Sequence, residues 1–297
     1  MTDFLDLRDF TKSELIHLLS LTKKLSNSDK KHLKGKILAL IFEKPSTRTS
    51  LSFMVAMENL GGHSIYFKQG DLQLSRGEPI KDVARVFTRQ VDGIAARVYA
   101  HKELLELSRY TDIPVINTLS DLSHPCQVLA DFYVLKERFE RLRGLKLAYI
   151  GDGNNVCNSL ITMCSKFGLT MDIACPRGYD PDKNVLKDAK KQPGEINILR
   201  DPKKAVKNAN IIYTDVWVSM GMDGAKERIL KDFKNYQINS KLLANVKNDY
   251  IFMHCLPAHR GLEITEEVIE GPNSVVWDQA YSRMLTSKAL LYHFLKN

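Results

Sequence analysis

The chain has 297 residues, a length that favours two domains, with one large α/β unit as the alternative. Apolar residues make up 44% and charged residues 26%, which is ordinary globular usage and excludes disorder as the main state. Lysine and arginine number 43 against 35 acidic residues, giving a net charge of +8. This excess favours an anionic partner without separating nucleic acid from a small phosphate ester.

The composition also bears on the compartment. No run of about 18 uncharged apolar residues occurs, and a membrane-spanning helix needs about 20. The first nine residues carry three acids, whereas signal and transit peptides are basic and poor in acid. The five cysteines are odd in number and widely spaced, which argues against a disulfide framework. We therefore expect a cytoplasmic protein without a membrane partner.

Short apolar runs alternate with helical periodicity along the chain. Residues 36–42 predict a buried strand, and apolar residues at helical spacing from Phe53 to Leu60 predict the helix after it. Further strands are expected at 65–67, 94–98, 114–116, 145–150, 171–175, 196–199, 211–214, 250–253 and 274–277. This alternation predicts an α/β fold of two doubly wound parallel-sheet domains, with helices on both faces of each sheet.

The seam between the domains is expected where a long helical stripe from Val128 ends in charged residues. We predict domains at 1–143 and 144–279. Residues 280–297 predict a C-terminal helix, which could pack on either domain and which we expect to pack back on the first.

Function is expected in the loops after the strands, because doubly wound sheets bind ligands at the carboxyl ends of their strands. Ser46, Thr47, Arg48 and Thr49 follow the first strand and open a helix. The N–H groups and positive dipole end of a helix start favour an oxyanion such as phosphate. An ordinary N-cap by Ser46 or Thr47 is the alternative, and no Walker sequence occurs.

Two later loops of the first half also carry chemistry. Arg97 ends a strand rich in alanine, and its permanent charge needs an anion, either a ligand or a structural carboxylate. His124 and Gln127 precede the long helix, with Pro125 suited to its first turn. The imidazole can donate to a carbonyl oxygen and the amide can pair with another amide, although His124 could also be a plain loop residue.

A dinucleotide site is one hypothesis for the second half. Gly151 and Gly153 follow a strand, and Asp172 lies near the distance expected for a ribose ligand. Val156, however, stands where the third glycine of the fingerprint should be. The signal for nicotinamide binding is therefore weak.

Metal binding and covalent catalysis are two further hypotheses. His124, Cys126, His254, Cys255 and His259 could be zinc ligands, but their spacings match no site template. Cys255 could be a nucleophile. Successive strand residues point to opposite faces, so His254 is poorly placed to activate its neighbour.

Five motifs taken together resemble the aspartate/ornithine carbamoyltransferase family, in order over nearly the whole chain. They are Ser46-Thr47-Arg48-Thr49, Arg97-Val98-Tyr99, His124-Pro125-Cys126-Gln127, Ser219-Met220-Gly221 and His254-Cys255-Leu256-Pro257. The last two, with Asp215 and Trp217, are similar to the members that act on ornithine. The resemblance implies transfer of a carbamoyl group from carbamoyl phosphate to the δ-amine of L-ornithine, giving L-citrulline and phosphate in arginine metabolism. It also implies an active site in the cleft between the domains, and neither cofactor nor metal.

The resemblance further implies a role for each matching residue. The implied carbamoyl-phosphate ligands are Ser46, Thr47, Arg48, Thr49, Gln73, Arg97, His124, Gln127, Cys255, Leu256 and Arg283, and the implied ornithine ligands are Asn155, Asp215, Ser219 and Met220. Arg97 and His124 would donate to the carbamoyl oxygen, where negative charge grows in the tetrahedral transition state, and Gln127 would orient the carbamoyl nitrogen. Cys255, the fourth implied catalytic residue, would position the δ-amine and handle its proton. Gln73 would reach the phosphate of a neighbouring subunit, which implies a homotrimer or a multiple of trimers.

The acceptor and the direction of reaction stay open. Carbamoyltransferases that act on aspartate, putrescine or N-acetylornithine share the fold, and one site can catalyse either direction of the reaction. A nucleic-acid partner is not expected, because such binding needs clustered basic residues with interleaved aromatics. The basic runs at 23–24, 30–31 and 190–191 are short and better fit solvated helix faces.

Overall fold

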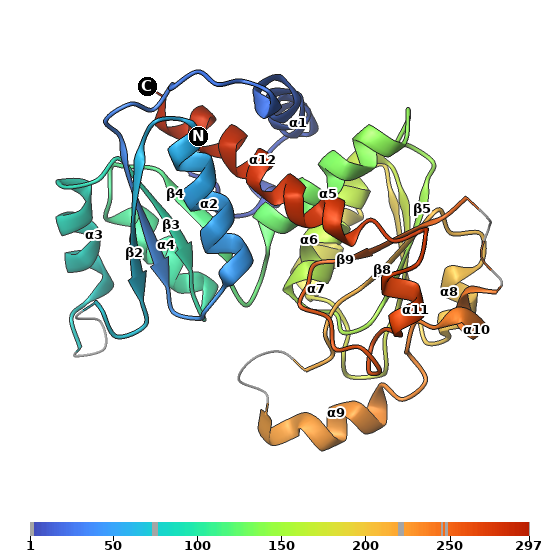
Figure 1. Ribbon diagram of the computed structural model, residues 1–297. Coiled ribbons are helices and arrows are strands. Elements are labelled where there is room, and N and C mark those ends of the chain that lie inside the picture. The colour runs from blue at the N-terminus through green and yellow to red at the C-terminus, as the bar shows by residue number, and fades with distance from the viewer. Residues whose placement is uncertain (1–2, 73–76, 219–222, 245, 247–248, 297) are drawn as a thin grey trace. The chain divides into compact units, whose positions relative to one another are not determined.

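A computed structural model describes residues 3–72, 77–218, 223–244, 246 and 249–296. The chain divides into two compact units, the first formed by Met1–Tyr133 with Tyr281–Asn297 and the second by Val134–Ala280 (Figure 1). Each unit is an α/β layer structure around one parallel sheet, which confirms the predicted fold class.

Unit 1 contains a four-stranded parallel sheet in the order β2-β1-β3-β4. Its strands are β1 (Ile37–Phe42), β2 (His63–Lys68), β3 (Gly93–Arg97) and β4 (Val115–Leu119). Its helices are α1 (Lys12–Ser26), α2 (Thr47–Asn59), α3 (Ile80–Thr88), α4 (His101–Arg109) and the first part of α5 (Pro125–Arg138), with a short 3-10 turn at Leu7–Asp9. From β1 the chain goes to β2 on one side and then returns to β3 on the other side of β1. The carboxyl ends of β1 and β3 therefore mark a topological switch point, where doubly wound sheets bind ligands.

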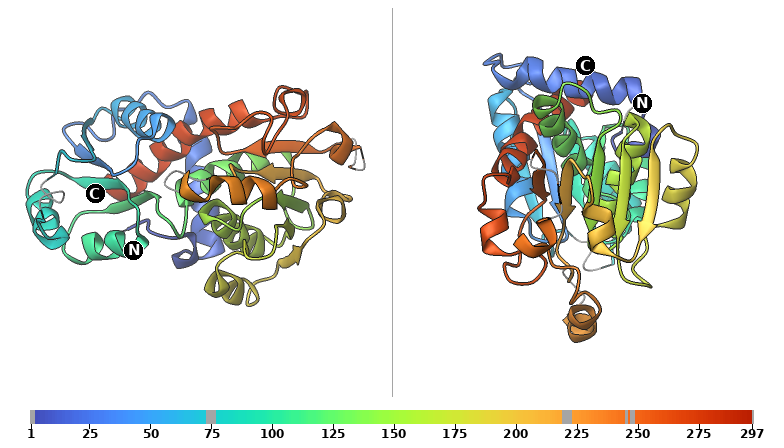
Figure 2. Two further views of the ribbon diagram at one scale, coloured as in Figure 1. Left: turned by 90° about the horizontal axis from the view of Figure 1, so that it is seen from below. Right: turned by 90° about the vertical axis from the view of Figure 1, so that its right-hand side faces the viewer.

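The two faces of this sheet are covered by different helices. Apolar side chains of α3 and α4, including Val83, Phe87 and Leu104, form one core with Ala39 and Ile94 of the sheet. The connection from β1 to β2 runs along the sheet in the direction opposite to the two later connections. Because such crossovers are right-handed, its helix α2 lies on the other face (Figure 1). The last helix, α12 (Val276–Leu295), brings the end of the described chain to its beginning, with the ring centroids of Phe4 and Phe294 6.2 Å apart (Figure 2).

Unit 2 contains a five-stranded parallel sheet in the order β7-β6-β5-β8-β9. Its strands are β5 (Lys146–Ile150), β6 (Thr170–Ala174), β7 (Glu195–Leu199), β8 (Ile211–Thr214) and β9 (Ile251–His254). Its helices are α6 (Asn155–Phe167), α7 (Lys183–Ala189), α8 (Pro202–Val206), α9 (Lys226–Asp232), α10 (Ser240–Leu243) and α11 (Glu266–Ile269), with a 3-10 turn at Asp223–Ala225. The switch point lies between β5 and β8, so the loops after these strands are the expected ligand-binding loops.

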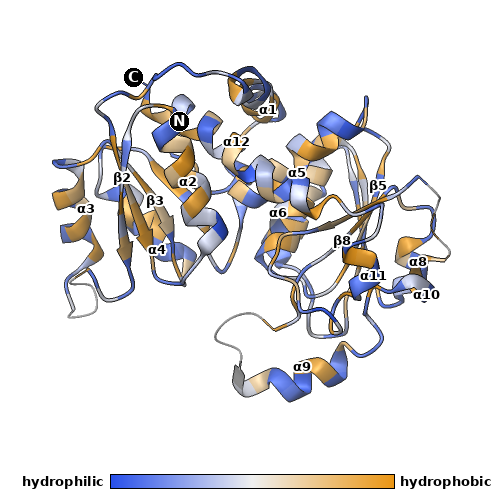
Figure 3. Cartoon of the chain, in the orientation of Figure 1, coloured by the Kyte–Doolittle hydropathy of each residue, from blue (hydrophilic) through white to orange (hydrophobic). Residues whose placement is uncertain are grey.

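The distribution of hydrophobic residues follows the layers of sheet and helices. Figure 3 shows hydrophobic residues concentrated in the strands, whereas α9 is mostly hydrophilic, and of its side chains only Ile229 is buried. No helix among the described residues combines the length and hydrophobicity that a bilayer crossing requires.

The strand predicted at 274–277 is wrong. Ser274 makes an isolated bridge to Phe252, and Val276 already begins α12. The helix forms because Val276, Gln279 and Arg283 are all buried at helical spacing, and two of these three are polar. A pattern search on apolar residues alone therefore finds only the short run before them.

Candidate active site

The loop after β1 leads straight into α2 and provides a helix N-terminus at the switch point of unit 1. Ser46 is the N-cap, and its hydroxyl accepts a hydrogen bond from the backbone N–H of Thr49 at 3.4 Å. The first turn of α2 contains no acidic residue. The positive end of the helix dipole and the remaining N–H groups are therefore not neutralised by a carboxylate of that turn. The capping role of Ser46 and the phosphate site are thus compatible. Thr47 is exposed and Arg48 is half-buried at this helix start.

Three residues from distant parts of the sequence meet inside unit 1. The guanidinium of Arg283 on α12 donates through Nη1 to Oε1 of Gln127 and through Nη2 to the hydroxyl of Thr49, the latter at 2.9 Å. All three side chains are at most 3% exposed. Arg283 therefore lies beside the N-terminus of α2 rather than on a helix surface.

His124 lies in the same neighbourhood and is 5% exposed. Burial, together with the positive charges of Arg283 and Arg97, holds the pKa of His124 well below its ordinary value of 6.5. The imidazole is therefore neutral at pH 7 and can donate one hydrogen bond without carrying charge. Arg97 ends β3 and is 9% exposed.

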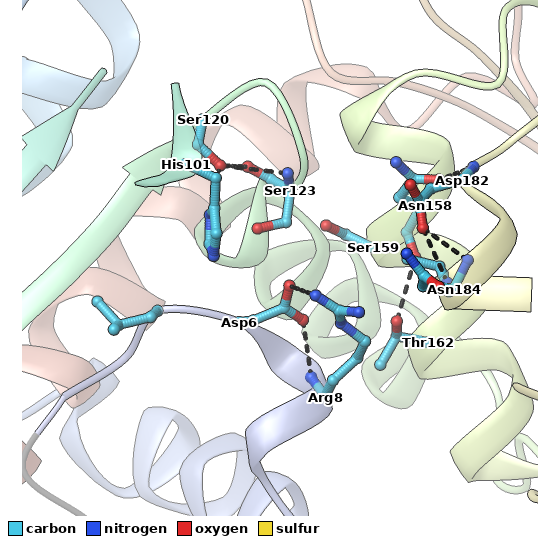
Figure 4. Close-up of polar contacts among 12 residues, drawn as sticks. Asp6, Arg8, His101, Ser120, Ser123, Asn158, Ser159, Thr162, Asp182 and Asn184 are labelled. Atoms are coloured by element: carbon cyan, nitrogen blue, oxygen red, sulfur yellow. Dashed lines mark hydrogen bonds and ion pairs between the residues drawn. The ribbon is translucent and has the colours of Figure 1, made fainter. Parts of the chain in front are cut away.

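The segment before His124 is fixed by short side chains. Ser120 accepts a hydrogen bond from the backbone N–H of Ser123 at 3.3 Å and contacts Nδ1 of His101 at 2.9 Å (Figure 4). Asn117 of β4 donates to the hydroxyl of Ser123 at 3.1 Å. His124 follows directly, and α5 begins at Pro125. His124 thus lies between a hydrogen-bonded turn and the start of α5, and both fix its position.

Unit 2 holds a candidate group of its own, a hydrogen-bonded carboxylate. Asp215 directly follows β8 and is 7% exposed. Its Oδ1 accepts from the backbone N–H of Val216 at 2.8 Å and from the thiol of Cys255 at 2.9 Å, and its Oδ2 accepts from Asn154 at 2.7 Å. Three hydrogen bonds hold this carboxylate in place, and a carboxylate is a suitable partner for an amine or ammonium ligand.

Asn154 is a site residue that the sequence did not single out. Its carbonyl oxygen caps α6 by accepting from the backbone N–H groups of Val156 and Cys157, both at 3.0 Å. Its amide nitrogen is the donor to Asp215. The neighbouring Asn155, predicted as an ornithine ligand, accepts from Val156 at 2.9 Å. An asparagine directly before an apolar helical stripe is a recognisable N-cap signal, but that signal does not reveal the second partner.

The turn after β9 presents Cys255 and Leu256. Nδ1 of His254 accepts from the backbone N–H of Leu256 at 2.8 Å, and Nε2 lies 3.3 Å from the buried carboxylate of Glu263. Leu256 has a φ of 55°, a left-handed conformation uncommon outside glycine. Both ring nitrogens of His254 thus engage other groups, so the geometry does not favour a Cys255–His254 nucleophile pair.

The zinc ligands considered from the sequence do not form one cluster among the described residues. The thiol of Cys126 donates to the carbonyl of Asn117, and burial raises its pKa to about 12, which disfavours a thiolate ligand. A different set, Asp215, His254 and Cys255, has donor atoms within 4.8 Å of one another. A metal there would have to replace the hydrogen bonds already described.

The dinucleotide hypothesis also loses support. A Cβ on Gly153 would lie 2.3 Å from the backbone nitrogen of Pro181, so close packing within the unit explains this glycine. Asp172 forms a salt bridge with Lys146 at 2.6 Å and accepts from Asn197 at 3.0 Å, which is a structural role. The loop at 180–182 is also tied to α6, where Asn158 accepts from the backbone N–H of Asp182 (Figure 4).

Three of the predicted ligands, Gln73, Ser219 and Met220, lie outside the described residues. The others fall into two groups, one in each unit. Unit 1 holds the α2 start and the buried side chains of Arg97, His124, Gln127 and Arg283, all of which can donate hydrogen bonds to an anion or to a polar group attached to it. Unit 2 holds Asp215 with Cys255, which can receive an amine.

Comparison with known proteins identifies the class. Residues 2–137 match the description "Aspartate/ornithine carbamoyltransferase, carbamoyl-P binding domain", and residues 143–294 match "Aspartate/ornithine carbamoyltransferase, Asp/Orn binding domain". The chain belongs to the aspartate/ornithine carbamoyltransferase family.

Individual relatives point to one branch of that family. The chain is 51% identical to the ornithine carbamoyltransferase of Pyrococcus horikoshii, over 97% of this chain and 94% of that protein. The solved ornithine carbamoyltransferase of Pyrococcus furiosus superposes with a TM-score of 0.95 at 49% identity, over 99% of this chain and 96% of that one. The anabolic ornithine carbamoyltransferase of Campylobacter jejuni superposes with a TM-score of 0.94 at 41% identity, over 99% of both chains.

Proposed function

We propose that this enzyme transfers the carbamoyl group of carbamoyl phosphate to the δ-amine of L-ornithine, giving L-citrulline and phosphate. The observation that carries the proposal is the buried group of Arg283, Gln127 and Thr49 at the start of α2, beside a neutral His124. Full-length relatives at about half identity that are named for this activity support it.

In unit 1, the phosphate group binds the α2 start through Ser46, Thr47, Arg48 and Thr49, with charge from Arg97 and Arg283. Arg97 and His124 donate to the carbamoyl oxygen, which gains negative charge as the carbonyl carbon becomes tetrahedral. Gln127 accepts from the carbamoyl nitrogen, and the Leu256 main chain adds a contact to the same group. Gln73 of a neighbouring subunit contacts the phosphate.

In unit 2, Asp215 and Cys255 receive the δ-amine, while Asn155, Ser219 and Met220 hold the α-amino acid end. The neutral amine attacks the carbonyl carbon, and the bond from that carbon to the phosphate oxygen breaks with its electrons on phosphate. An ornithine ammonium loses two protons overall, one leaving on the phosphate and one reaching solvent. The hydrogen-bonded pair of Asp215 and Cys255 is suited to orient the amine and pass on a proton.

This assigns one substrate to each part of the chain. Residues 1–143 are proposed to bind carbamoyl phosphate and residues 144–279 ornithine, and the helix of residues 280–297 serves the first part through Arg283. The two matched domain descriptions support this assignment. No cofactor or metal enters the proposed reaction.

The active assembly is proposed to be a homotrimer or a multiple of trimers. Unit 1 exposes large apolar side chains on two elements that pack together, α2 and β2. This α2–β2 apolar face consists of Leu51, Met54, Val55 and Tyr66, between 37% and 58% exposed. Such a patch is typical of a contact surface, and a second copy of the chain is the proposed occupant.

The proposed location is the cytoplasm and the proposed direction is towards citrulline for arginine synthesis. All five cysteines are free thiols, as expected in a reducing compartment. Two relatives, from Campylobacter jejuni and Pyrococcus furiosus, are named anabolic ornithine carbamoyltransferases. Their names support the proposed direction towards citrulline.

One assay tests the reaction. The protein is mixed with carbamoyl phosphate and, separately, with ornithine, aspartate, putrescine or N-acetylornithine, and the carbamoylated product is measured. Citrulline from ornithine is expected as the dominant product. Folded protein that makes no citrulline, or that prefers another acceptor, would overturn the assignment.

A further inference from the structure

A buried carboxylate lies behind Gln127 on the same helix. Asp131 is one helical turn after Gln127 on α5, and its side chain is 0% exposed. Nε2 of Gln127 donates to Oδ1 of Asp131 at 2.8 Å, while Oε1 of Gln127 accepts from Arg283. A continuous set of hydrogen bonds thus runs from Asp131 through Gln127 and Arg283 to Thr49 at the helix start.

These partners define which end of the amide points where. Oδ1 of Asp131 accepts in this pair, so the NH₂ group of Gln127 faces Asp131. A guanidinium only donates, so the oxygen of Gln127 has to face Arg283. Under the proposed function Arg283 also serves the phosphate, and Asp131 is the partner that keeps the amide turned while Arg283 does so.

Building on the proposed function, we propose that Asp131 is a positioning residue for carbamoyl transfer. It holds Gln127 with its oxygen towards the substrate, where that oxygen accepts from the carbamoyl NH₂ group. If the amide were rotated by half a turn, the NH₂ group of Gln127 would face the carbamoyl NH₂ group, and neither group could accept a hydrogen bond. Asp131 thereby favours carbamoyl phosphate over acetyl phosphate, which has a methyl group in place of the NH₂ and gains nothing from a correctly turned oxygen.

The first test separates positioning from general support of the fold. Asp131→Leu removes the acceptor, so binding of carbamoyl phosphate should weaken about tenfold while binding of acetyl phosphate changes about twofold or less. Both affinities are measured by titration calorimetry on protein whose thermal unfolding has been checked. Equal weakening for the two ligands would contradict the proposal.

The second test exchanges donor and acceptor. Gln127→Glu alone places two carboxylates face to face and should reduce kcat/KM for carbamoyl phosphate about a hundredfold. In the double variant with Asp131→Asn, the introduced amide donates to the new carboxylate, which keeps an oxygen towards the substrate. The double variant should recover about tenfold or more over Gln127→Glu, although Asp131→Asn alone costs only a few-fold. Additive losses in a folded double variant would overturn the proposal, and this arm stands even where Asp131→Leu fails to fold.

Asp172→Asn is the matched control. Asp172 is 7% exposed and accepts from the amide of Asn197 at 3.0 Å, a similar pair with no link to Gln127. It should lower thermal stability without changing the preference for carbamoyl over acetyl phosphate, and it should not rescue Gln127→Glu. A wild-type protein that makes no citrulline would count against the proposed function, whereas an active wild type with additive variants counts against Asp131 alone.

Discussion

Burial gives His124 a chemical character different from that of an exposed histidine. Two guanidinium groups and a desolvated pocket keep its pKa well below 6.5, so at neutral pH it is a neutral donor. A neutral imidazole keeps one N–H, which can donate to a developing oxyanion. The positive charge beside His124 then comes from Arg283 and Arg97, whose protonation does not change with pH in the ordinary range.

Asp152 should make the stability of the protein depend on pH. Burial, with a smaller effect of Asp215, raises its pKa from 3.8 to about 6. Because the folded pKa lies above the unfolded one, its contribution to stability is complete below about pH 3.8 and is lost as the pH rises through about 6. Asp152→Asn should therefore increase the free energy of unfolding at pH 8 by about 1–3 kcal/mol.

Urea titrations of both proteins at several pH values test this. The gain should shrink as the pH falls from 8 towards 4, since the aspartate becomes neutral like the asparagine. A gain that is the same at pH 4 and pH 8 would show that charge burial is not its cause.

Arg48 tests the phosphate site against a purely structural helix start. Arg48→Ala should lower kcat/KM by about a hundredfold or more, because the phosphate group proposed to bind here loses a positive partner. The side chain is only half-buried, so the free energy of unfolding should change by about 0.5 kcal/mol or less. Arg85→Ala, at an arginine that is 62% exposed on α3, is the control and should leave turnover unchanged.

At the scale of elements, the N-cap residue of α6 links the stability of the helix to the proposed chemistry. Asn154 caps the helix with its oxygen and donates to Asp215 with its nitrogen. Asn154→Asp keeps an equally good cap but faces Asp215 with a second carboxylate, so KM for ornithine should rise about tenfold or more although the cap is kept. Asn154→Ala should lose both, including about 1 kcal/mol of stability.

Chemical denaturation and steady-state kinetics on both variants separate the two roles. The informative comparison is between them, because only the alanine variant removes the cap. Unchanged ornithine kinetics in Asn154→Asp would mean that the bond to Asp215 has no part in binding the amine.

Most strands were predictable because they contain short apolar stretches and are bounded by polar loops. The start of α12 was not, since its buried stripe includes Gln279 and Arg283, and an apolar pattern does not reveal polar residues that find buried partners. The loops that carry chemistry could be named, but their partners could not. Gln127 and Arg283 are 156 positions apart, and Asn154 and Asp215 are 61 apart. Tertiary packing, rather than local sequence, decides such pairs.

At the scale of the whole molecule, the α2–β2 apolar face predicts the assembly. Leu51→Lys together with Val55→Lys should convert a species three times the 33.8 kDa of one chain into a smaller one, because charged side chains resist desolvation in a contact. Sedimentation equilibrium measures the mass. Leu105→Lys, at a leucine 51% exposed on α4, is the control and should leave the mass unchanged. A wild type that sediments as a single chain would contradict the trimer.

The net charge of +8 has a smaller role in substrate binding than the composition alone suggests. Of the arginines proposed to face carbamoyl phosphate, Arg97 and Arg283 are buried and Arg48 is half-buried. Most of the basic excess is therefore left for the surface, where it can assist solubility and mildly steer an anion.

The position of Arg283 in the chain also sets an order of assembly. Unit 1 draws on two segments of sequence, and all of unit 2 lies between them. A ribosome therefore synthesises residues 134–280 after Thr49 and Gln127 but before Arg283. During that interval the nascent first unit has every strand of its sheet and lacks one of its guanidinium groups. The anion site proposed for it can be completed only after the unit proposed to bind ornithine has been made.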